Sequence, residues 1–294
     1  MMTERSLSVI VACYRDEGSV EEMLRRLTAT LGDITSDYEI IYVNDASPDN
    51  AEAVLIEAAR RDPHLKVISL SRNFGSQNAF SSGLQIAKGD GVILMDGDLQ
   101  DPPELIPDFV ERWLDGYDVV YGVRVKRRES LFRQLAYKVF YRLFRGLAYV
   151  DIPVDAGDFA LMDRKVVRVI NDLPERDRFL RGLRAWVGFR QTGVPYVRAE
   201  RYAGESTNSL WDNVRWAKKA VFSFSYKPLE WISYGAYAVV GLTALGIAFY
   251  LIRYAFIQDA PPGWMTQMLA TLFLGGVQLL SLSIIGEYVA RLFE

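Results

Sequence analysis

The sequence predicts an α/β domain with a mostly parallel sheet, followed by interfacial amphipathic helices and two transmembrane helices. Three observations lead to this prediction. Short apolar runs alternate with helical patterns in the first third of the chain. Polar clusters follow directly after several of these runs. Two long apolar runs lie at the C-terminal end. Together they indicate a ligand-binding α/β domain joined to a membrane anchor.

The alternation begins with Leu7–Cys13, a continuous apolar run that is typical of a buried parallel strand. A helical pattern over Glu21–Leu31 places four large apolar residues on one side. Further along, the patterns predict strand Tyr38–Val43, helix Ala51–Arg60, strand Lys66–Leu70, helix Asn78–Ala87 and strand Gly91–Met95. Regular alternation of this kind predicts a mostly parallel sheet with helices on both faces.

Polar clusters occur where the predicted strands end. They are Tyr14–Glu17, Asn44–Asp49, Ser71–Asn73 and Asp96–Gln100. The carboxyl ends of parallel strands share one edge of the sheet, and ligands bind in open α/β sheets at that edge. We therefore expect these clusters to converge on one binding site.

Two later segments, 130–150 and 209–230, mix basic residues with large apolar and aromatic ones. Basic, aromatic-rich amphipathic helices lie in the headgroup layer of membranes. Helices that pack on a core and expose a basic face are the alternative for both segments. We expect membrane contact, because two apolar runs follow.

These runs are Trp231–Ile257 and Met265–Ile285, and each can supply the ~20 apolar residues of a transmembrane helix. The predicted organisation is an α/β domain over 1–208, an amphipathic juxtamembrane helix over 209–230 and a two-helix transmembrane domain over 231–294. The α/β domain includes the interfacial helix at about 130–150.

Charge predicts the orientation of this anchor. Arg215, Lys218, Lys219 and Lys227 precede the first run, whereas Gln258–Gly263 between the runs contains neither Lys nor Arg. Because positive residues concentrate on the cytoplasmic side, we expect a multi-pass protein of the inner membrane with its α/β domain in the cytoplasm.

The composition excludes several functions. The net charge of −3 excludes a broad basic surface for nucleic acid. Cys13 is the only cysteine, so the chain forms no intramolecular disulfide. A single histidine, His64, excludes a His-based metal site and a Ser-His-Asp triad.

The sharpest local motif is Asp96-Gly97-Asp98-Leu99-Gln100, directly after an apolar strand. Its two carboxylates and one amide oxygen are hard ligands that suit Mg²⁺ or Mn²⁺. Such an ion would bridge a pyrophosphate and neutralise charge on a departing nucleoside diphosphate. The structural alternative is an ordinary Asp-Gly-Asp turn.

At this point the chain resembles the family 2 glycosyltransferases. Within them it is similar to polyprenyl-phosphate glycosyltransferases such as dolichol-phosphate mannose synthase and the bacterial undecaprenyl-phosphate glucosyltransferases. The resemblance covers nearly the whole chain, through Leu7–Ile10, Val43–Ser47, Leu70–Gly75, Asp96–Pro103, Ala156–Phe159 and the two C-terminal apolar runs.

The resemblance implies a GT-A (Rossmann-like) fold and a divalent metal, Mg²⁺ or Mn²⁺. The implied activity is inverting transfer of a hexose from a nucleotide-sugar to polyprenyl (undecaprenyl) phosphate, and we favour UDP over GDP. Homo-oligomerisation through the spans is a further expectation. The sugar and the downstream glycan, O-antigen or another cell-envelope polymer, are not assigned.

The resemblance also implies a donor site. Asp45 would contact the nucleobase or ribose, with Tyr14 and Glu17 lining the same pocket, and Arg72 belongs to the donor motif. Arg201 would contact the pyrophosphate. Two loops depart from the family pattern. Ala12–Glu17 replaces the usual Pro-x-Tyr-Asn-Glu, and Ser206–Asn208 replaces Ser-Lys-Tyr.

The metal and acceptor roles follow in the same way. Asp98 and Gln100 resemble the direct metal ligands, with Asp96 beside them and facing the donor sugar or ribose. A phosphate monoester is already anionic, so its capture requires cations and positioning. Arg124 and Arg133 fit that role, since a guanidinium matches phosphate geometry. Asp158 would lie near the reacting carbon, where it orients the acceptor or acts as a nominal base. Surface charge and a turn aspartate are the structural alternatives.

Two other functions compete with this interpretation. A processive polysaccharide synthase would usually carry a Gln-x-x-Arg-Trp motif and more spans, and Arg184-Ala185-Trp186 lacks that pattern. A membrane-bound regulator would bind nucleotide-sugar without turnover. Metal-dependent turnover separates the regulator from the enzyme.

Overall fold

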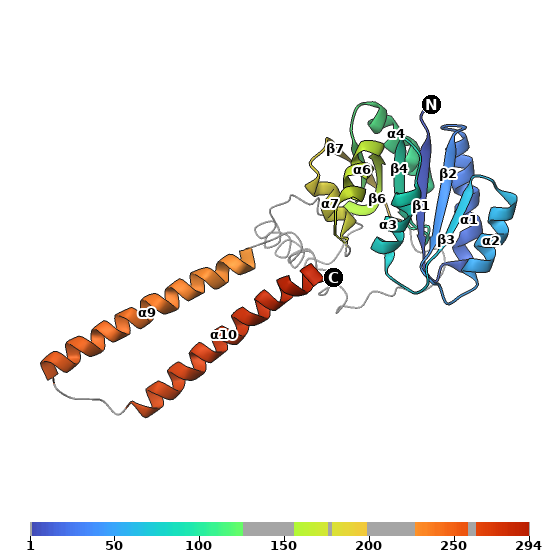
Figure 1. Ribbon diagram of the computed structural model, residues 1–294. Helices are drawn as coiled ribbons and strands as arrows, with labels where there is room; N and C mark the ends of the chain where they lie inside the picture. Colours follow the sequence, from blue (N-terminus) through green and yellow to red (C-terminus); the bar gives the residue numbers. More distant parts are fainter. Residues whose placement is uncertain (1, 126–155, 176–177, 199–226, 258–262, 294) are drawn as a thin grey trace. The chain divides into compact units, whose positions relative to one another are not determined.

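The computed structural model describes residues 2–125, 156–175, 178–198, 227–257 and 263–293 (Figure 1). They fall into two compact units, the sheet with its surrounding helices and the C-terminal helical pair. Residues 130–150 and 209–226 of the two predicted amphipathic segments lie outside the described residues, as do Arg133 and Arg201, so their predicted roles stay predictions. Residues 227–230 of the second segment form the first turn of helix α9 (Lys227–Ile257).

The first unit is built on a seven-stranded sheet. Its strands lie in the order β3 (Leu65–Ser69), β2 (Tyr38–Asn44), β1 (Leu7–Cys13), β4 (Gly91–Asp96), β6 (Ala156–Asp163), β5 (Val119–Arg124) and β7 (Gln191–Tyr196). Strand β6 runs antiparallel to both of its neighbours, and every other pairing is parallel. This confirms the predicted mostly parallel α/β sheet.

Helices cover both faces of the sheet, as predicted (Figure 1). The described helices of this unit are α1 (Glu17–Gly32), α2 (Ala51–Arg61), α3 (Ser76–Ile86), the short 3₁₀ helix η1 (Pro103–Leu105), α4 (Ile106–Leu114), α6 (Arg164–Asp172) and α7 (Leu180–Trp186). The apolar sides of α1, α2 and α4 pack in one core with alternate residues of β1. Helix α3 covers the opposite face, where Gly83 lies so close to Ile10 that a Cβ would be 2.4 Å from its Cγ2.

The strand order creates the crevice that the polar clusters predict. Strands β2 and β3 lie on one side of β1, and β4 lies on the other. The connections after β1 and β4 therefore leave in opposite directions, which opens a crevice at their carboxyl ends. Because β6 is antiparallel, its first residues lie at this same edge. Leu94 pairs with Ala160. Asp96 follows Leu94 by two residues and Asp158 precedes Ala160 by two, so both aspartates lie toward this edge.

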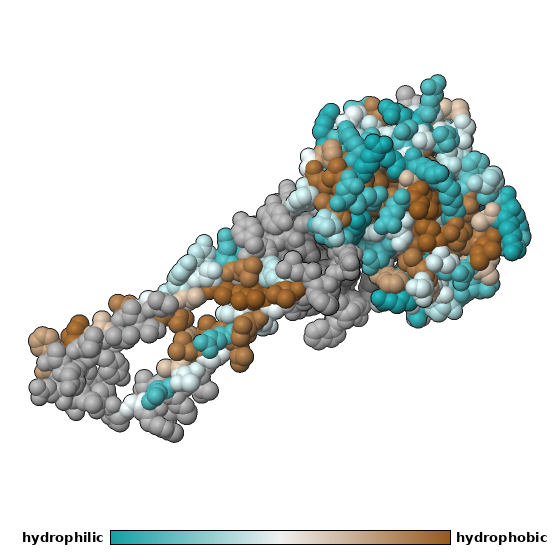
Figure 2. Space-filling view, in the orientation of Figure 1, coloured by the Kyte–Doolittle hydropathy of each residue, from teal (hydrophilic) through white to brown (hydrophobic). Residues whose placement is uncertain are grey.

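The second unit consists of α9 (Lys227–Ile257) and α10 (Trp264–Phe293), which contact each other. Both predicted apolar runs are therefore helical. Large apolar side chains are exposed on both helices, among them Trp231, Leu245, Phe256, Phe273 and Leu279 (Figure 2). Across the residues that the structure describes, no helix combines the length and the apolar character that crossing a membrane requires. The two transmembrane helices stay a prediction.

Candidate active site

The acidic loop after β4 is held tightly against β1. The Gly97 N–H donates to the Ala12 carbonyl at 2.9 Å, and the Ser19 hydroxyl donates to the Gly97 carbonyl at 2.6 Å. A Cβ on residue 97 would lie 2.9 Å from the Ala12 oxygen. Glycine is required between the two aspartates because the chains approach so closely, and its hydrogen bonds hold the backbone that carries Asp96 and Asp98.

Backbone strain collects at the same edge of the sheet. Arg15, Ala46 and Leu99 have φ values of 60°, 50° and 60°, and they are the non-glycine residues with positive φ among those described. They lie in the loops that follow β1, β2 and β4 respectively. A left-handed conformation costs such residues roughly 1–2 kcal/mol. Strain of this kind concentrates at functional sites, so three separate loops indicate one site.

The loop after β3 depends on Asp45. Its side chain is only 3% exposed, and its two carboxylate oxygens accept from the Phe74 N–H at 2.7 Å and the Gly75 N–H at 2.8 Å. The Arg72 guanidinium stacks 4.0 Å from the centre of the Phe74 ring. Asp45 therefore holds in place the loop that carries Arg72. Its predicted contact with the nucleobase or ribose stays a prediction.

The loops after β1 and β2 are linked by hydrogen bonds. Glu17 accepts from the Asn50 N–H at 3.1 Å, and the Glu17 N–H donates to Asp49 Oδ2 at 3.1 Å. Tyr14 is half-buried, and the Arg15 guanidinium lies 5.4 Å from its ring centre. The structure thus places the predicted donor residues Tyr14, Asp45 and Arg72 on the loops after three neighbouring strands, and Glu17 at the first position of α1 beside them.

Several carboxylates lie close together beside these loops. Asp98 and Asp101 are 4% and 1% exposed, and Asp96 is half-buried at the end of β4. Burial, and then the charges of Asp101, Asp158 and Asp98, raise the pKa of Asp96 to about 8, while Arg198 opposes this rise. Burial also raises the pKa of Asp101, although Arg124, Tyr196 and Arg198 partly offset it. A bound cation would relieve this crowding of negative charge.

The donor set fits a metal ion that is shared with a substrate. Among the described residues, no three His, Cys, Asp or Glu side chains form a group that could hold a metal by themselves. Mg²⁺ in nucleotide enzymes usually takes only one or two protein carboxylates, and substrate phosphates and water complete its shell. The carboxylates repel one another strongly without forming a closed cage, which suits such an open site. Asp98, Gln100 and Asp96 stay the predicted ligands.

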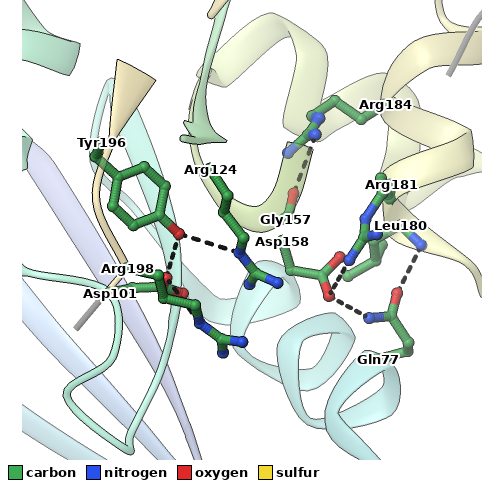
Figure 3. Close-up of polar contacts among 10 residues, drawn as sticks. All are labelled: Gln77, Asp101, Arg124, Gly157, Asp158, Leu180, Arg181, Arg184, Tyr196 and Arg198. Atoms are coloured by element: carbon green, nitrogen blue, oxygen red, sulfur yellow. Dashed lines mark hydrogen bonds and ion pairs between the residues drawn. The ribbon is translucent and has the colours of Figure 1, made fainter. Parts of the chain in front are cut away.

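Arg124 is held at this edge by a chain of polar contacts (Figure 3). Its Nε donates to the Tyr196 hydroxyl oxygen at 3.3 Å, and that hydroxyl donates to Asp101 Oδ1. Arg198 Nε lies 3.9 Å from the same carboxylate oxygen. Burial lowers the pKa of Arg124, but Asp101 and Tyr196 outweigh burial, so its pKa is raised and it stays charged. Two guanidinium groups therefore lie beside the acidic loop.

Two glycines make room for the side chains of Arg124 and Tyr196. A Cβ on Gly157 would lie 2.8 Å from Arg124 Nη2, and one on Gly122 would lie 2.7 Å from the Tyr196 ring. The pairing of β5 with β6 is irregular between Tyr121 and Val123. Irregularities of this kind redirect side chains near active sites.

Asp158, the third residue of strand β6, faces Gln77 and Arg181 (Figure 3). Its Oδ2 accepts from Gln77 Nε2 at 3.1 Å and from Arg181 Nη2 at 3.4 Å. Behind it, the buried Arg184 donates to the Gly157 carbonyl at 3.2 Å. Burial lowers the pKa of Arg184 to about 10, with Asp158 opposing this and Arg181 adding to it. Asp158 is therefore held among cations at the same edge as Asp96.

The structure thus brings together most of the described residues that the sequence singles out, and it adds others. The sequence predicts no site role for four of these residues, Gln77, Asp101, Tyr196 and Arg198. Gln77 is 81 residues away from Asp158, and Tyr196 is 95 away from Asp101. Their partners are distant in the chain, so no local pattern could reveal these contacts. Asp101 directly follows the acidic motif, and that position was the one available signal.

Comparisons with known proteins identify the family to which the chain belongs. The family model described as glycosyl transferase family 2 matches residues 8–170, and the model described as GtrB C-terminal hairpin matches residues 236–292. An uncharacterized glycosyltransferase of Synechocystis sp. is 43% identical, over 98% of this chain and 91% of the relative. The bactoprenol glucosyl transferase of Shigella phage SfV is 34% identical, over 98% of this chain and 94% of the relative.

A solved structure shares the fold. The mannosyltransferase of Pyrobaculum calidifontis in complex with GDP-Man and Mn²⁺ has a TM-score of 0.51 and 19% identity, and the match covers 99% of this chain and 87% of that one. Identity this low shows the fold alone. With the family match over residues 8–170 and full-length relatives, the chain belongs to glycosyl transferase family 2 and is a glycosyltransferase with a GT-A domain.

Proposed function

We propose that this enzyme transfers a hexose from a nucleotide-sugar to polyprenyl phosphate, with inversion at the anomeric carbon. The observation that carries the proposal is the position of Arg124. It is held charged by Tyr196 and Asp101, beside the acidic loop and Gly157, the residue before Asp158. The 34% identity to a bactoprenol glucosyl transferase supports the same acceptor class.

The donor belongs in the crevice between β1 and β4. Tyr14, Glu17, Asp45 and Arg72 surround the nucleoside end in this proposal, with UDP favoured over GDP. Asp98 and Gln100, with Asp96, hold Mg²⁺ or Mn²⁺. When bound, this ion neutralises charge on the departing diphosphate. Arg201 is the proposed contact to the pyrophosphate.

The acceptor needs to be positioned more than it needs to be deprotonated. A phosphate monoester carries its own negative charge, and Arg124 can bind it through two parallel hydrogen bonds. Asp158 orients the acceptor near the reacting carbon, and Arg133 supplies a second cation. Direct displacement by a phosphate oxygen inverts the carbon and requires no covalent enzyme intermediate.

Membrane association follows from the nature of the acceptor. A polyprenyl chain resides in a lipid bilayer, and α9 and α10 expose large apolar side chains. The GtrB hairpin family covers these two helices. We propose that residues 231–294 anchor the enzyme in the inner membrane, with the GT-A domain in the cytoplasm.

Transfer of radiolabel from a panel of UDP- and GDP-sugars into organic-extractable lipid tests the proposal. The assay contains purified full-length protein, undecaprenyl phosphate and Mn²⁺ or Mg²⁺, with EDTA in a parallel reaction. We expect one labelled, EDTA-sensitive lipid. Asp98→Asn should abolish the label, whereas Asp172→Asn, at an exposed site in α6, should not. Nucleotide-sugar binding with no lipid product from any donor would favour the regulator instead.

A further inference from the structure

The side chain of Gln77 joins three parts of the active site that are far apart in the sequence. Gln77 lies in the first turn of α3 and is 7% exposed. Its Oε1 accepts from the Leu180 N–H of α7 at 2.8 Å, and its Nε2 donates to Asp158 Oδ2 of β6 at 3.1 Å (Figure 3). A buried amide with both ends in use has a single orientation.

The orientation of this amide determines what it can do for Asp158. The Leu180 N–H is a donor, so it must face the amide oxygen, and the amide NH₂ must then face Asp158. The NH₂ group can only donate. Oδ2 of Asp158 must therefore accept from Gln77. Arg181 Nη2 donates a second hydrogen bond to the same oxygen at 3.4 Å. Its Oδ1 has no hydrogen-bond partner within the described part of the chain.

The same helix is attached to the loop on the donor side. Gly75, with φ of +88°, immediately precedes α3, and its N–H donates to Asp45 Oδ2 at 2.8 Å. Gln77 follows two residues later. The start of α3 therefore connects Asp45, at the end of β2, with Asp158, at the start of β6. Rigid supports of this kind determine how accurately a reacting group is placed.

We propose that Gln77 is a positioning residue, which clamps Oδ2 of Asp158 and leaves Oδ1 directed at the reacting sugar and phosphate. This inference rests on the proposed function, because it concerns the same site. Gln77 acts through Asp158 and touches neither substrate. Its contribution is to the placement of a carboxylate that the transfer step requires.

Gln77→Glu is the sharpest test. The variant keeps the size of the side chain and an acceptor for the Leu180 N–H, but it turns an oxygen toward Asp158 Oδ2 in place of a donor. Gln85→Glu is the matched control, because Gln85 is exposed on the same helix and the variant adds the same charge. Both variants are assayed by lipid-linked transfer with donor and lipid varied separately, and by thermal unfolding of the full chain.

We expect Gln77→Glu to lower kcat about 10- to 100-fold, with the KM for the nucleotide-sugar within about twofold, as for a misplaced reacting group. Gln85→Glu should leave both constants unchanged. Gln77→Met is the second variant, for use if Gln77→Glu does not fold. Methionine fills the space without hydrogen bonding to Asp158, so it should lower kcat in the same way.

Three results would overturn the inference. The first is an unchanged kcat in Gln77→Glu. The second is a rise in KM and a fall in Tm that account for the lost turnover. The third is failure of both Gln77 variants to fold, which would assign Gln77 to the fold instead. A wild-type enzyme that forms no lipid-linked sugar would refute the proposed function itself, so the two failures are distinguishable.

Discussion

Replacement of Asp96 by asparagine should stabilise the metal-free protein at alkaline pH while it impairs transfer. Asp96 lies among the carboxylates of Asp98, Asp101 and Asp158, and burial with these charges raises its pKa to about 8 from an ordinary value of 3.8. Folding therefore favours the neutral form of this group. Asparagine has nearly the same shape and is neutral at every pH.

The sign and size of the effect follow from proton linkage. Because the folded pKa lies above the unfolded one, the cost of ionising Asp96 is absent below about pH 4, grows as the pH rises, and is complete above about pH 8. A rise in the pKa of Asp96 from 3.8 to about 8 would by itself correspond to about 5 kcal/mol. Asp96 keeps some contact with solvent, which screens its neighbours, so we expect about 2 kcal/mol. For a protein of this size that equals roughly 4–8 °C in Tm.

The assay is thermal unfolding of the full chain in EDTA at about pH 4 and about pH 9, with Asp172→Asn as the exposed control. Asp96→Asn should raise Tm at about pH 9 and change it much less at about pH 4, where most of the cost of ionising Asp96 is absent. Saturating Mn²⁺ should shrink the gain, because the ion stabilises the wild type more than the variant. A lower Tm for Asp96→Asn at about pH 9, or the same change at both pH values, would refute the reasoning.

Three further predictions concern the same site. Tyr196→Phe removes the hydroxyl between Arg124 and the buried Asp101. The free energy of unfolding should fall by about 2 kcal/mol, which a lower Tm would report. An unchanged Tm would contradict a stabilising role for this hydroxyl. Gly157→Ala places a Cβ 2.8 Å from Arg124 Nη2 and should displace this guanidinium. The KM for lipid phosphate should rise roughly tenfold, which corresponds to about 1.4 kcal/mol. Equal KM values for the variant and the wild type would count against Arg124 as the phosphate contact. Asp98→Ala should abolish Mn²⁺-dependent transfer and the Tm increase caused by Mn²⁺; full activity in metal-replete buffer would remove it from the metal site.

The local elements were predictable from periodicity alone. Strand β1 covers the predicted Leu7–Cys13, and helix α1 includes the predicted Glu21–Leu31 with its apolar side in the core. Continuous apolar runs and helical spacing are properties of neighbouring residues. Strand β6 could not be placed in the same way, because its antiparallel pairing with β4 and β5 joins segments that are far apart in the chain.

The structure shows where the described residues of the predicted site lie, and their roles stay predictions. Arg124 and the acidic loop lie at the edge of the sheet where the parallel strands end, and Asp158 lies there because antiparallel β6 begins at that edge. The structure shows in addition that Asp45 holds the loop of Arg72 through two backbone N–H groups. A carboxylate at a strand end looks the same in sequence whether it binds backbone or ligand.

Residue types at short spacing predict the α/β alternation, the glycine between two aspartates and the two C-terminal apolar helices. The resemblance of motifs along the whole chain predicts the family. The folded chain adds that Tyr196 and Asp101 hold Arg124, that Gln77 faces Asp158, and that burial with neighbouring charges raises the pKa of Asp96 to about 8. Hydrogen bonds and burial depend on which distant segments meet in space, and residue spacing along the chain carries no record of that.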